Sequence, residues 1–198
     1  MKIYVTGLGV VSGIGLGVAE NIASLRKHQH GMGKVTLFPT ELDVPVSEVK
    51  YSNEELKRLL SLDIQKTFSR TALLGMLAAR EAVDDAQLDL NTLRVGLISS
   101  TSVGGMDLSE HFYNAFKKDN RKGRLREVIS HDCGASTEMI ADYLKVNDFV
   151  TTISTACSSA ANAIMLGARM IRNGQLDAAI VGGTDALCKF TLNGFNSL

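Results

Sequence analysis

A short polar turn between a strand signal and a helix signal is the feature that most constrains the fold. The apolar, β-branched run Phe-Val-Thr-Thr-Ile at residues 149–153 is typical of a buried strand. Small and aliphatic residues from Ala160 to Arg172 predict a helix, and Asn173-Gly174 ends it. Between them stands Thr155-Ala156-Cys157-Ser158-Ser159. We therefore expect Cys157 on a sharp strand-to-helix turn, where the positive end of the helix dipole favours the nucleophilic thiolate.

Strand and helix signals alternate along the rest of the chain. The clearest helix is predicted over Ser69–Ala86, where apolar residues recur at helical spacing. A glycine-rich turn follows the first strand, and residues 28–53, which hold both prolines, are expected to form a surface excursion. Further strands are predicted at residues 2–6, 94–99 and 178–181, and further helices at residues 18–27, 52–60, 106–116 and 136–143. This alternation predicts a layered α/β architecture with a largely parallel or mixed sheet.

Composition narrows the classes of protein that fit. A chain of 198 residues can bury a substantial core. Its 21 basic residues balance 21 acidic ones, which gives no support to a nucleic-acid partner. No apolar stretch reaches the length of a membrane span, and the N-terminus lacks a signal-peptide pattern. The three cysteines are widely spaced, so we expect no disulfide framework and a cytoplasmic protein without a membrane partner.

Five short segments follow one another in a characteristic order. They are Val-Thr-Gly-Leu-Gly-Val-Val-Ser at residues 5–12, Ser69-Arg70, Ser102-Val103-Gly104-Gly105, the turn around Cys157, and Val-Gly-Gly-Thr-Asp at residues 181–185 with Gly194-Phe195. This series resembles the N-terminal half of a β-ketoacyl-[acyl-carrier-protein] synthase of the thiolase-like superfamily. The resemblance covers nearly the whole chain, and its most specific part is Thr-Ala-Cys-Ser-Ser.

The resemblance implies a fold and a domain organisation. The fold would be α/β and thiolase-like, with one layered βαβαβαββ half of an α/β/α/β/α sandwich and a mixed sheet. Residues 1–198 would form the nucleophile-bearing N-terminal domain, and the C-terminal half is absent from this chain. Members of the family are homodimers, and residues 151–154 would be the strand that pairs across the two-fold axis.

The resemblance also implies a reaction. Cys157 would be the acylated nucleophile in a decarboxylative Claisen condensation with malonyl-carrier protein, as in fatty acid or polyketide-type biosynthesis. Its backbone N–H would be one of two donors to the oxyanion. Two histidines and a lysine of the site would come from the second half, so the chain alone is expected to be inactive. The histidines present here all precede Cys157 and match none of those positions: His28, His30, His111 and His131.

Substrate and partner residues follow from the same resemblance. Val103 and Phe195 align with residues that gate the acyl channel, although the alignment of Phe195 needs a one-residue deletion. The expected partners are acyl carrier protein, whose phosphopantetheine carries the substrates, the C-terminal half and a second copy. No other cofactor and no metal is expected.

A run of basic residues precedes the strand at residues 149–153. It could attract the acidic carrier, or it could be a solvated loop: Lys117, Lys118, Arg121, Lys122, Arg124 and Arg126.

Other functions remain open at this stage. One is a non-catalytic partner subunit that sets chain length, although such subunits typically replace the cysteine. Another is a thiolase-fold enzyme that acts on coenzyme A esters. Gly7-Leu8-Gly9 is also similar to a dinucleotide-binding turn, but Ser12 stands where the third glycine belongs and no acidic residue follows at the expected distance. Cys133 and Cys188 are interpreted as packing residues.

Overall fold

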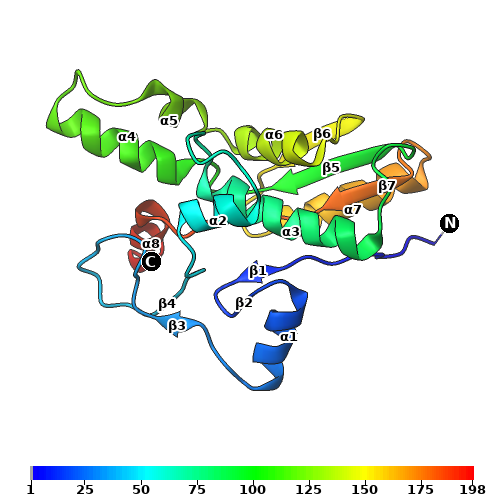
Figure 1. Cartoon of the computed structure of the whole chain (residues 1–198), viewed down its shortest axis with the longest axis horizontal. Helices are drawn as coiled ribbons and strands as arrows, with labels where there is room; N and C mark the ends of the chain where they lie inside the picture. The colour runs from blue at the N-terminus through cyan, green and yellow to red at the C-terminus, as the bar shows by residue number, and fades with distance from the viewer. Residues whose placement is uncertain (1) are drawn as a thin grey trace.

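Three parallel strands form the main sheet of the computed structural model, which describes residues 2–198 (Figure 1). The strands are β5 (Val95–Ser100), β6 (Phe149–Ile153) and β7 (Ala178–Val181), in the order β6-β5-β7. The central strand β5 is buried along its whole length, as its apolar sequence predicts. Because all three strands run in the same direction, the segments that follow them emerge at one edge of the sheet.

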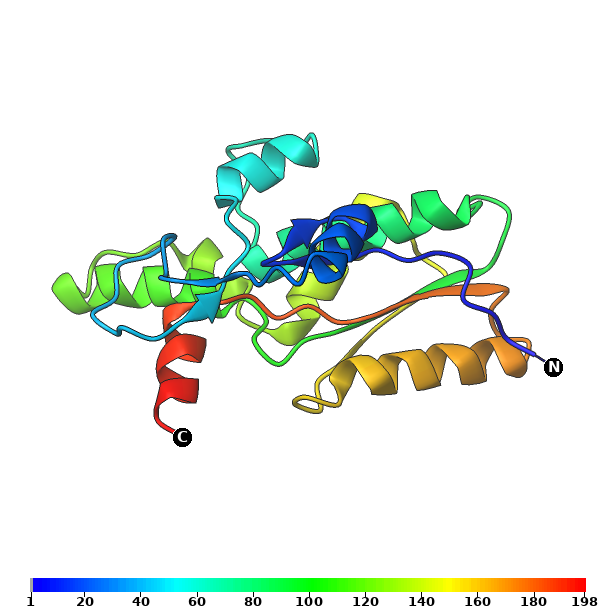
Figure 2. The same cartoon turned by 90° about the horizontal axis from the view of Figure 1, so that it is seen from below.

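Helices cover both faces of this sheet. Helix α7 (Ser159–Arg172) lies along one face, and α3 (Arg70–Ala86) with α6 (Cys133–Leu144) packs on the other (Figure 2). Side chains alternate along β5, so that Leu97 belongs to the core under α3 and α6 while Ile98 belongs to the core under α7. The structure therefore has the α/β layers that the sequence predicts.

The helix ends explain why the predicted helices form where they do. Ser69 caps α3 by accepting a hydrogen bond from the Ala72 N–H at 3.2 Å. Helix α2 (Asn53–Leu59) begins at a capping box in which Ser52 and Glu55 satisfy each other's backbone N–H groups. Helix α1 spans Val18–Arg26, close to its predicted bounds. The local signals at Ser69 and at Ser52 and Glu55 were sufficient to place the starts of α3 and α2 from sequence.

The N-terminal segment departs from the prediction. Residues 2–6 form no strand, and it is the residues that follow them, Gly7 to Val10, that lie against α3. The Leu8 N–H donates to Asp85 and the Val10 N–H donates to Glu81, both at 2.9 Å. A Cβ added at Gly9 would lie 1.8 Å from the Ala78 carbonyl oxygen. Glycine is therefore required in this segment, because a side chain there would prevent its backbone from lying so close to α3.

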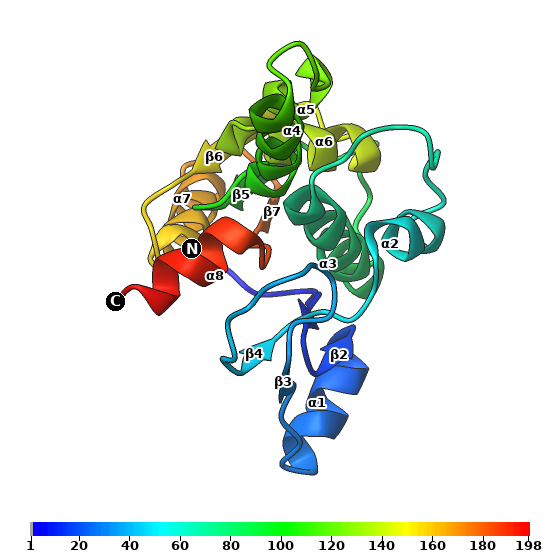
Figure 3. The ribbon, with the colours of Figure 1, turned by 90° about the vertical axis from the view of Figure 1, so that its left-hand side faces the viewer.

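Antiparallel pairing occurs in two small hairpins beside the main sheet. One joins β1 (Val11–Ser12) to β2 (Gly15–Leu16), and the other joins β3 (Met32–Gly33) to β4 (Val46–Ser47). Together with α1 they extend to one side of the sheet and its helices (Figure 3). Parallel and antiparallel pairing are thus both present, as a mixed arrangement predicts, but they occur in separate sheets.

The remaining helices lie beyond the carboxyl edge of the main sheet. They are α4 (Met106–Lys118), α5 (Leu125–Ile129) and α8 (Lys189–Asn196). The sequence predicts α4 but neither α5 nor α8, which are short. No helix within residues 2–198 is long and apolar enough to cross a membrane.

Candidate active site

Cys157 lies on the turn that joins β6 to α7. It stands two positions before Ser159, the first residue of α7, and its side chain is exposed. The preceding residue, Ala156, has a φ of 53°, which is an uncommon conformation for a residue with a side chain. The predicted sharp strand-to-helix turn is confirmed, and it presents the thiol to the surface.

A serine hydroxyl holds this turn together. Ser159, which is only 4% exposed, accepts a hydrogen bond from the Thr155 N–H at 2.7 Å and donates one to the Ala156 carbonyl at 2.7 Å. Asn162, one turn along α7, donates to the Thr155 hydroxyl at 2.8 Å. These contacts bracket Cys157 on both sides and fix the backbone that carries its sulfur.

The backbone N–H of Cys157 is free to bind a ligand. Within residues 2–198 it makes no hydrogen bond, whereas the N–H groups of Ser158 and Ser159 donate to the carbonyls of Thr155 and Ala156. A free N–H next to an exposed thiol is the arrangement that an oxyanion hole requires of its nucleophile. The geometry is therefore compatible with the predicted donor role.

Val103 lies at the same edge of the sheet as Cys157. It follows β5, whose end is joined to the end of β6 by a hydrogen bond from the Thr101 N–H to the Ile153 carbonyl at 3.2 Å. Gly104, with a φ of 56°, then turns the chain into α4. Loops at the carboxyl edge of a parallel sheet are the usual location of a binding site. The structure thus brings two of the predicted site residues to one edge.

Phe195 occupies a different position. It lies in the last turn of α8, is 77% exposed, and belongs to a helix that packs beside α4 (Figure 1). A cavity of about 450 Å³ between α4 and α8 is lined by Tyr113, Phe190 and their neighbours, and another of about 750 Å³ lies between α3 and the N-terminal segment. Neither cavity is lined by Cys157, Val103 or Phe195.

The other cysteines and the histidines that follow α3 have local partners. Cys188 is 2% exposed, and burial raises the pKa of its thiol, which suits the predicted packing role. Cys133 is half-buried, with its sulfur 3.9 Å from the Ser154 hydroxyl. The Nδ1 of His131 lies 2.8 Å from the Ser109 hydroxyl, and that of His111 lies 3.2 Å from a Glu127 oxygen. No group of three or more potential metal ligands is found within residues 2–198.

Comparison with known proteins assigns the chain to a family. Residues 1–198 match the family model described as "Beta-ketoacyl synthase, N-terminal domain". The chain belongs to this family. It is 28% identical to 3-oxoacyl-[acyl-carrier-protein] synthase 2 of Staphylococcus aureus (strain MRSA252), over 100% of this chain and 49% of that protein. It is also 28% identical to nodulation protein E of Rhizobium sp. (strain N33), over 93% of this chain and 47% of that protein.

Solved structures agree with this assignment. The ishigamide ketosynthase/chain length factor superposes with a TM-score of 0.88 at 29% identity, over 98% of this chain and 49% of that chain. The ketosynthase ApeO in complex with its chain length factor ApeC, from Xenorhabdus doucetiae, superposes with a TM-score of 0.76 at 25% identity, over 98% of this chain and 49% of that chain. The chain therefore spans about half the length of the relatives that it matches, and the thiolase-like fold is confirmed.

The sequence did not predict the contacts of several residues that shape the candidate site of this β-ketoacyl synthase domain. The serine at position 159 was recognised as part of the motif, but its hydrogen bonds across the turn were not predicted. Asp185 was likewise recognised only as the end of a glycine-rich segment, although its carboxylate contacts the Val103 loop. The available signal was a polar residue in the loop that follows each strand, since Ser159 stands six positions after the end of β6 and Asp185 four positions after the end of β7.

Proposed function

We propose that the chain is the nucleophile-bearing half of a β-ketoacyl-[acyl-carrier-protein] synthase in fatty acid or polyketide-type biosynthesis. The observation that carries the proposal is the exposed thiol of Cys157 on the β6–α7 turn of a chain that belongs to this family. The free N–H of the same residue supports it, because acyl transfer needs a donor at the developing oxyanion.

The reaction proceeds in two stages. The Cys157 thiolate attacks the carbonyl of an acyl group on the phosphopantetheine of acyl carrier protein, which forms a thioester on Cys157 and releases the carrier thiol after protonation. Malonyl-carrier protein then loses CO₂, and the resulting enolate carbon attacks the thioester carbonyl. The C–S bond breaks, the β-ketoacyl group stays on the second carrier, and the Cys157 thiolate is regenerated. Apart from the phosphopantetheine of the carrier, this scheme needs no cofactor.

The second half of the protein would complete the site. We expect it to supply the two histidines, the lysine and the second oxyanion donor, so residues 1–198 alone should not catalyse condensation. Loss of a single oxyanion donor typically slows acyl transfer by about 100 to 1,000-fold. Residues 1–198 would then be one domain of a two-domain enzyme.

A second copy of the protein and acyl carrier protein are the proposed partners. Strand β6 is at an edge of the sheet, so one side of its backbone is free to pair with the same strand of another copy. The proposed location is the cytoplasm, where free cysteine thiols are stable. A homodimer built on β6 would place two Cys157 turns close to its axis.

A non-catalytic chain-length subunit is the second candidate function. Two of the structural neighbours contain or bind a chain length factor, which favours this alternative. The intact and exposed Cys157 favours the catalytic role, because a subunit that forms no thioester has no use for this thiol. The presence or absence of acylation at Cys157 separates the two functions.

Mass spectrometry of the polypeptide that includes the second half tests the proposal. After incubation with acyl-carrier protein, we expect the mass of one acyl group on the peptide that contains Cys157. Cys157→Ala should abolish the modification, whereas Cys133→Ala, at a half-buried thiol, is the matched control and should retain it. An unmodified wild-type protein, or an acyl group located elsewhere, would contradict the proposed function.

A further inference from the structure

The loop that follows β7 packs against the first turn of α7. A Cβ added at Gly183 would overlap the Ser100 hydroxyl oxygen and would lie 3.1 Å from the Cβ of Ala160, which is closer than normal van der Waals contact. Ala160 is the second residue of α7 and stands three positions after Cys157. Gly183 therefore lies where the end of the sheet meets the helix that follows the nucleophile.

Hydrogen bonds to β5 hold the backbone on both sides of Gly183. The Gly182 N–H donates to the Ile98 carbonyl at 3.3 Å. The Thr184 N–H donates to the Ser100 carbonyl at 3.0 Å. The Ser100 hydroxyl, in a residue that is 1% exposed, donates to the Gly182 carbonyl at 3.0 Å. The loop therefore cannot move away from α7 without losing bonds to the central strand.

The turn around Cys157 has hydrogen bonds of its own. The Ser159 hydroxyl makes two bonds of 2.7 Å to the residues that precede Cys157, so the turn and the start of α7 form one unit. Ala160 is exposed on one side, which leaves this unit room to shift toward solvent. A side chain at Gly183 would thus displace the start of α7 and carry Cys157 with it, while the turn itself stays intact.

We propose that Gly183 is a positioning residue for acyl transfer, because its lack of a side chain sets where the Cys157 thiol and N–H stand relative to the rest of the site. This inference rests on the proposed function, in which the thiol attacks a thioester carbonyl. That attack needs the sulfur and the oxyanion donor aligned with a substrate that other parts of the site hold.

Alkylation of the same thiol makes a simpler demand. In the reaction with iodoacetamide, the Cys157 thiolate displaces iodide from a saturated carbon, and no oxyanion forms. Its rate depends on how accessible and how ionised the thiol is. Comparing acylation with alkylation therefore separates a displaced nucleophile from a damaged one.

The test uses the polypeptide that includes the second half, with both modifications measured on the Cys157 peptide by mass spectrometry. Gly183→Ala should slow acylation by an acyl-carrier thioester about tenfold, while alkylation by iodoacetamide keeps its wild-type rate. Gly182→Ala is the matched control and should keep both rates, since a Cβ added at Gly182 meets no atom within 4 Å. Combining Gly183→Ala with Ala160→Gly removes one side of the contact and should restore most of the acylation rate.

A second background keeps the test independent of whether Gly183→Ala folds by itself. Ser100→Ala removes the hydroxyl that the added Cβ would overlap, so that Ala160 is the main remaining obstacle. In this background Gly183→Ala should again slow acylation, and Ala160→Gly should again restore it.

Three results would overturn the inference. A wild-type acylation rate in the Gly183→Ala variants would do so and would leave the proposed function intact. Equal losses of acylation and alkylation would do so as well, because the turn itself would then be damaged. If the wild-type protein is alkylated but not acylated, the proposed function fails, and the role of Gly183 in acyl transfer fails with it.

Discussion

Ser159 shows how much of the candidate site depends on one residue. Its hydroxyl makes two hydrogen bonds of 2.7 Å across the turn around Cys157, and its own side chain is buried. The hydroxyl thereby stabilises a backbone conformation that Ala156 would not adopt readily by itself. The motif is therefore a structural unit as well as a chemical one.

Ser159→Ala is expected to weaken this turn. The lost hydrogen bonds should lower the free energy of unfolding by about 1 kcal/mol, and the displaced thiol should slow acylation of Cys157 by about tenfold. Urea unfolding and the rate of thioester formation measure the two effects. Ser158→Ala is the matched control, because that hydroxyl also bonds to Thr155 across Cys157 but is exposed, so that water can replace its hydrogen bonds. Equal losses in both variants would argue against a specific role of Ser159.

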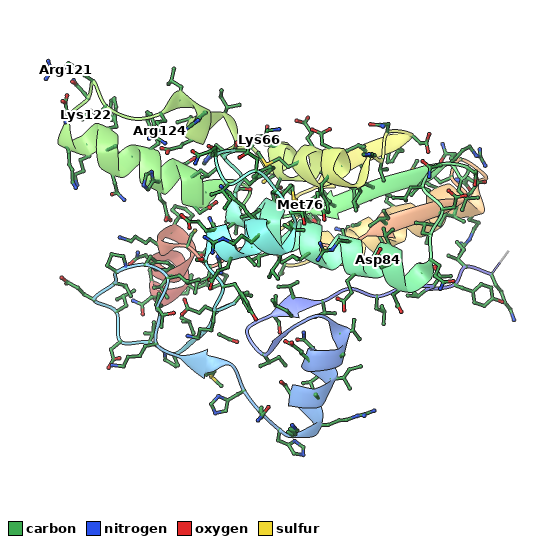
Figure 4. All side chains as sticks on the ribbon, viewed as in Figure 1. Lys66, Met76, Asp84, Arg121, Lys122 and Arg124 are labelled. Carbon is green, nitrogen blue, oxygen red and sulfur yellow. The ribbon has the colours of Figure 1, made fainter. Side chains whose placement is uncertain are left out.

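The basic residues of the run at positions 117–126 lie on the hairpin that α4 and α5 form. Arg121 and Lys122 lie at its far tip, and Arg124 lies at the start of α5 (Figure 4). Asp119, which is 3.2 Å from Arg121 and 3.9 Å from Lys122, is the single acidic residue among residues 117–126, so these residues carry a net charge of +5. Such a surface would attract an acidic carrier protein from a distance.

Reversing this charge should slow the encounter with the carrier. Lys122→Glu combined with Arg124→Glu is expected to reduce acyl transfer by about tenfold at low salt, with the difference disappearing at high salt. Stopped-flow acyl transfer at two ionic strengths measures this. Lys2→Glu combined with Lys27→Glu changes the net charge equally at exposed residues of other elements. If acyl transfer is slowed equally in both double variants, the cause is the net charge of the protein and not docking of the carrier at this hairpin.

At the scale of the whole molecule, α7 has an apolar surface without a covering layer. Its inner face packs on the sheet through Ala163 and Gly167, whereas Ile164 and Met165 on its outer face are 54% and 49% exposed. A helix that is apolar on both faces is typical of the interior of a larger protein. The second half of the proposed two-domain enzyme would cover this surface.

Self-association of the isolated chain should reveal the uncovered face. We expect residues 1–198 to form concentration-dependent oligomers in analytical ultracentrifugation, because burying each apolar side chain is worth about 1.5–3 kcal/mol. Ile164→Glu combined with Met165→Glu should shift the chain toward the monomer. Arg172→Glu, in the last turn of the same helix, is the control and should not. A wild-type chain that stays monomeric at all concentrations would show that this face is stable in water.

Local signals were enough to predict most elements. Ser69 and the capping box at Ser52 and Glu55 place the starts of two helices, and the apolar run of β5 predicts a central strand. The position of Cys157 at a strand-to-helix turn was also predictable, because its causes lie within a few residues on either side. These features depend on backbone conformations that adjacent residues select.

Contacts between distant residues decided the rest. Residues 2–6 have the composition of a strand, yet they form none, and Asp85 and Glu81 bind the backbone of the following residues Leu8 and Val10 to α3. The start of helix α8 is capped locally by the Thr191 hydroxyl, which accepts from the Cys188 N–H at 2.9 Å, and also by Glu110, 79 positions earlier than Lys189, which accepts from the Lys189 N–H. The sequence by itself thus determined the α/β alternation and the nucleophile on its turn. Only the tertiary structure decided which carboxylates hold the surrounding loops, because those partners lie far apart in the sequence and come together only when the sheet forms.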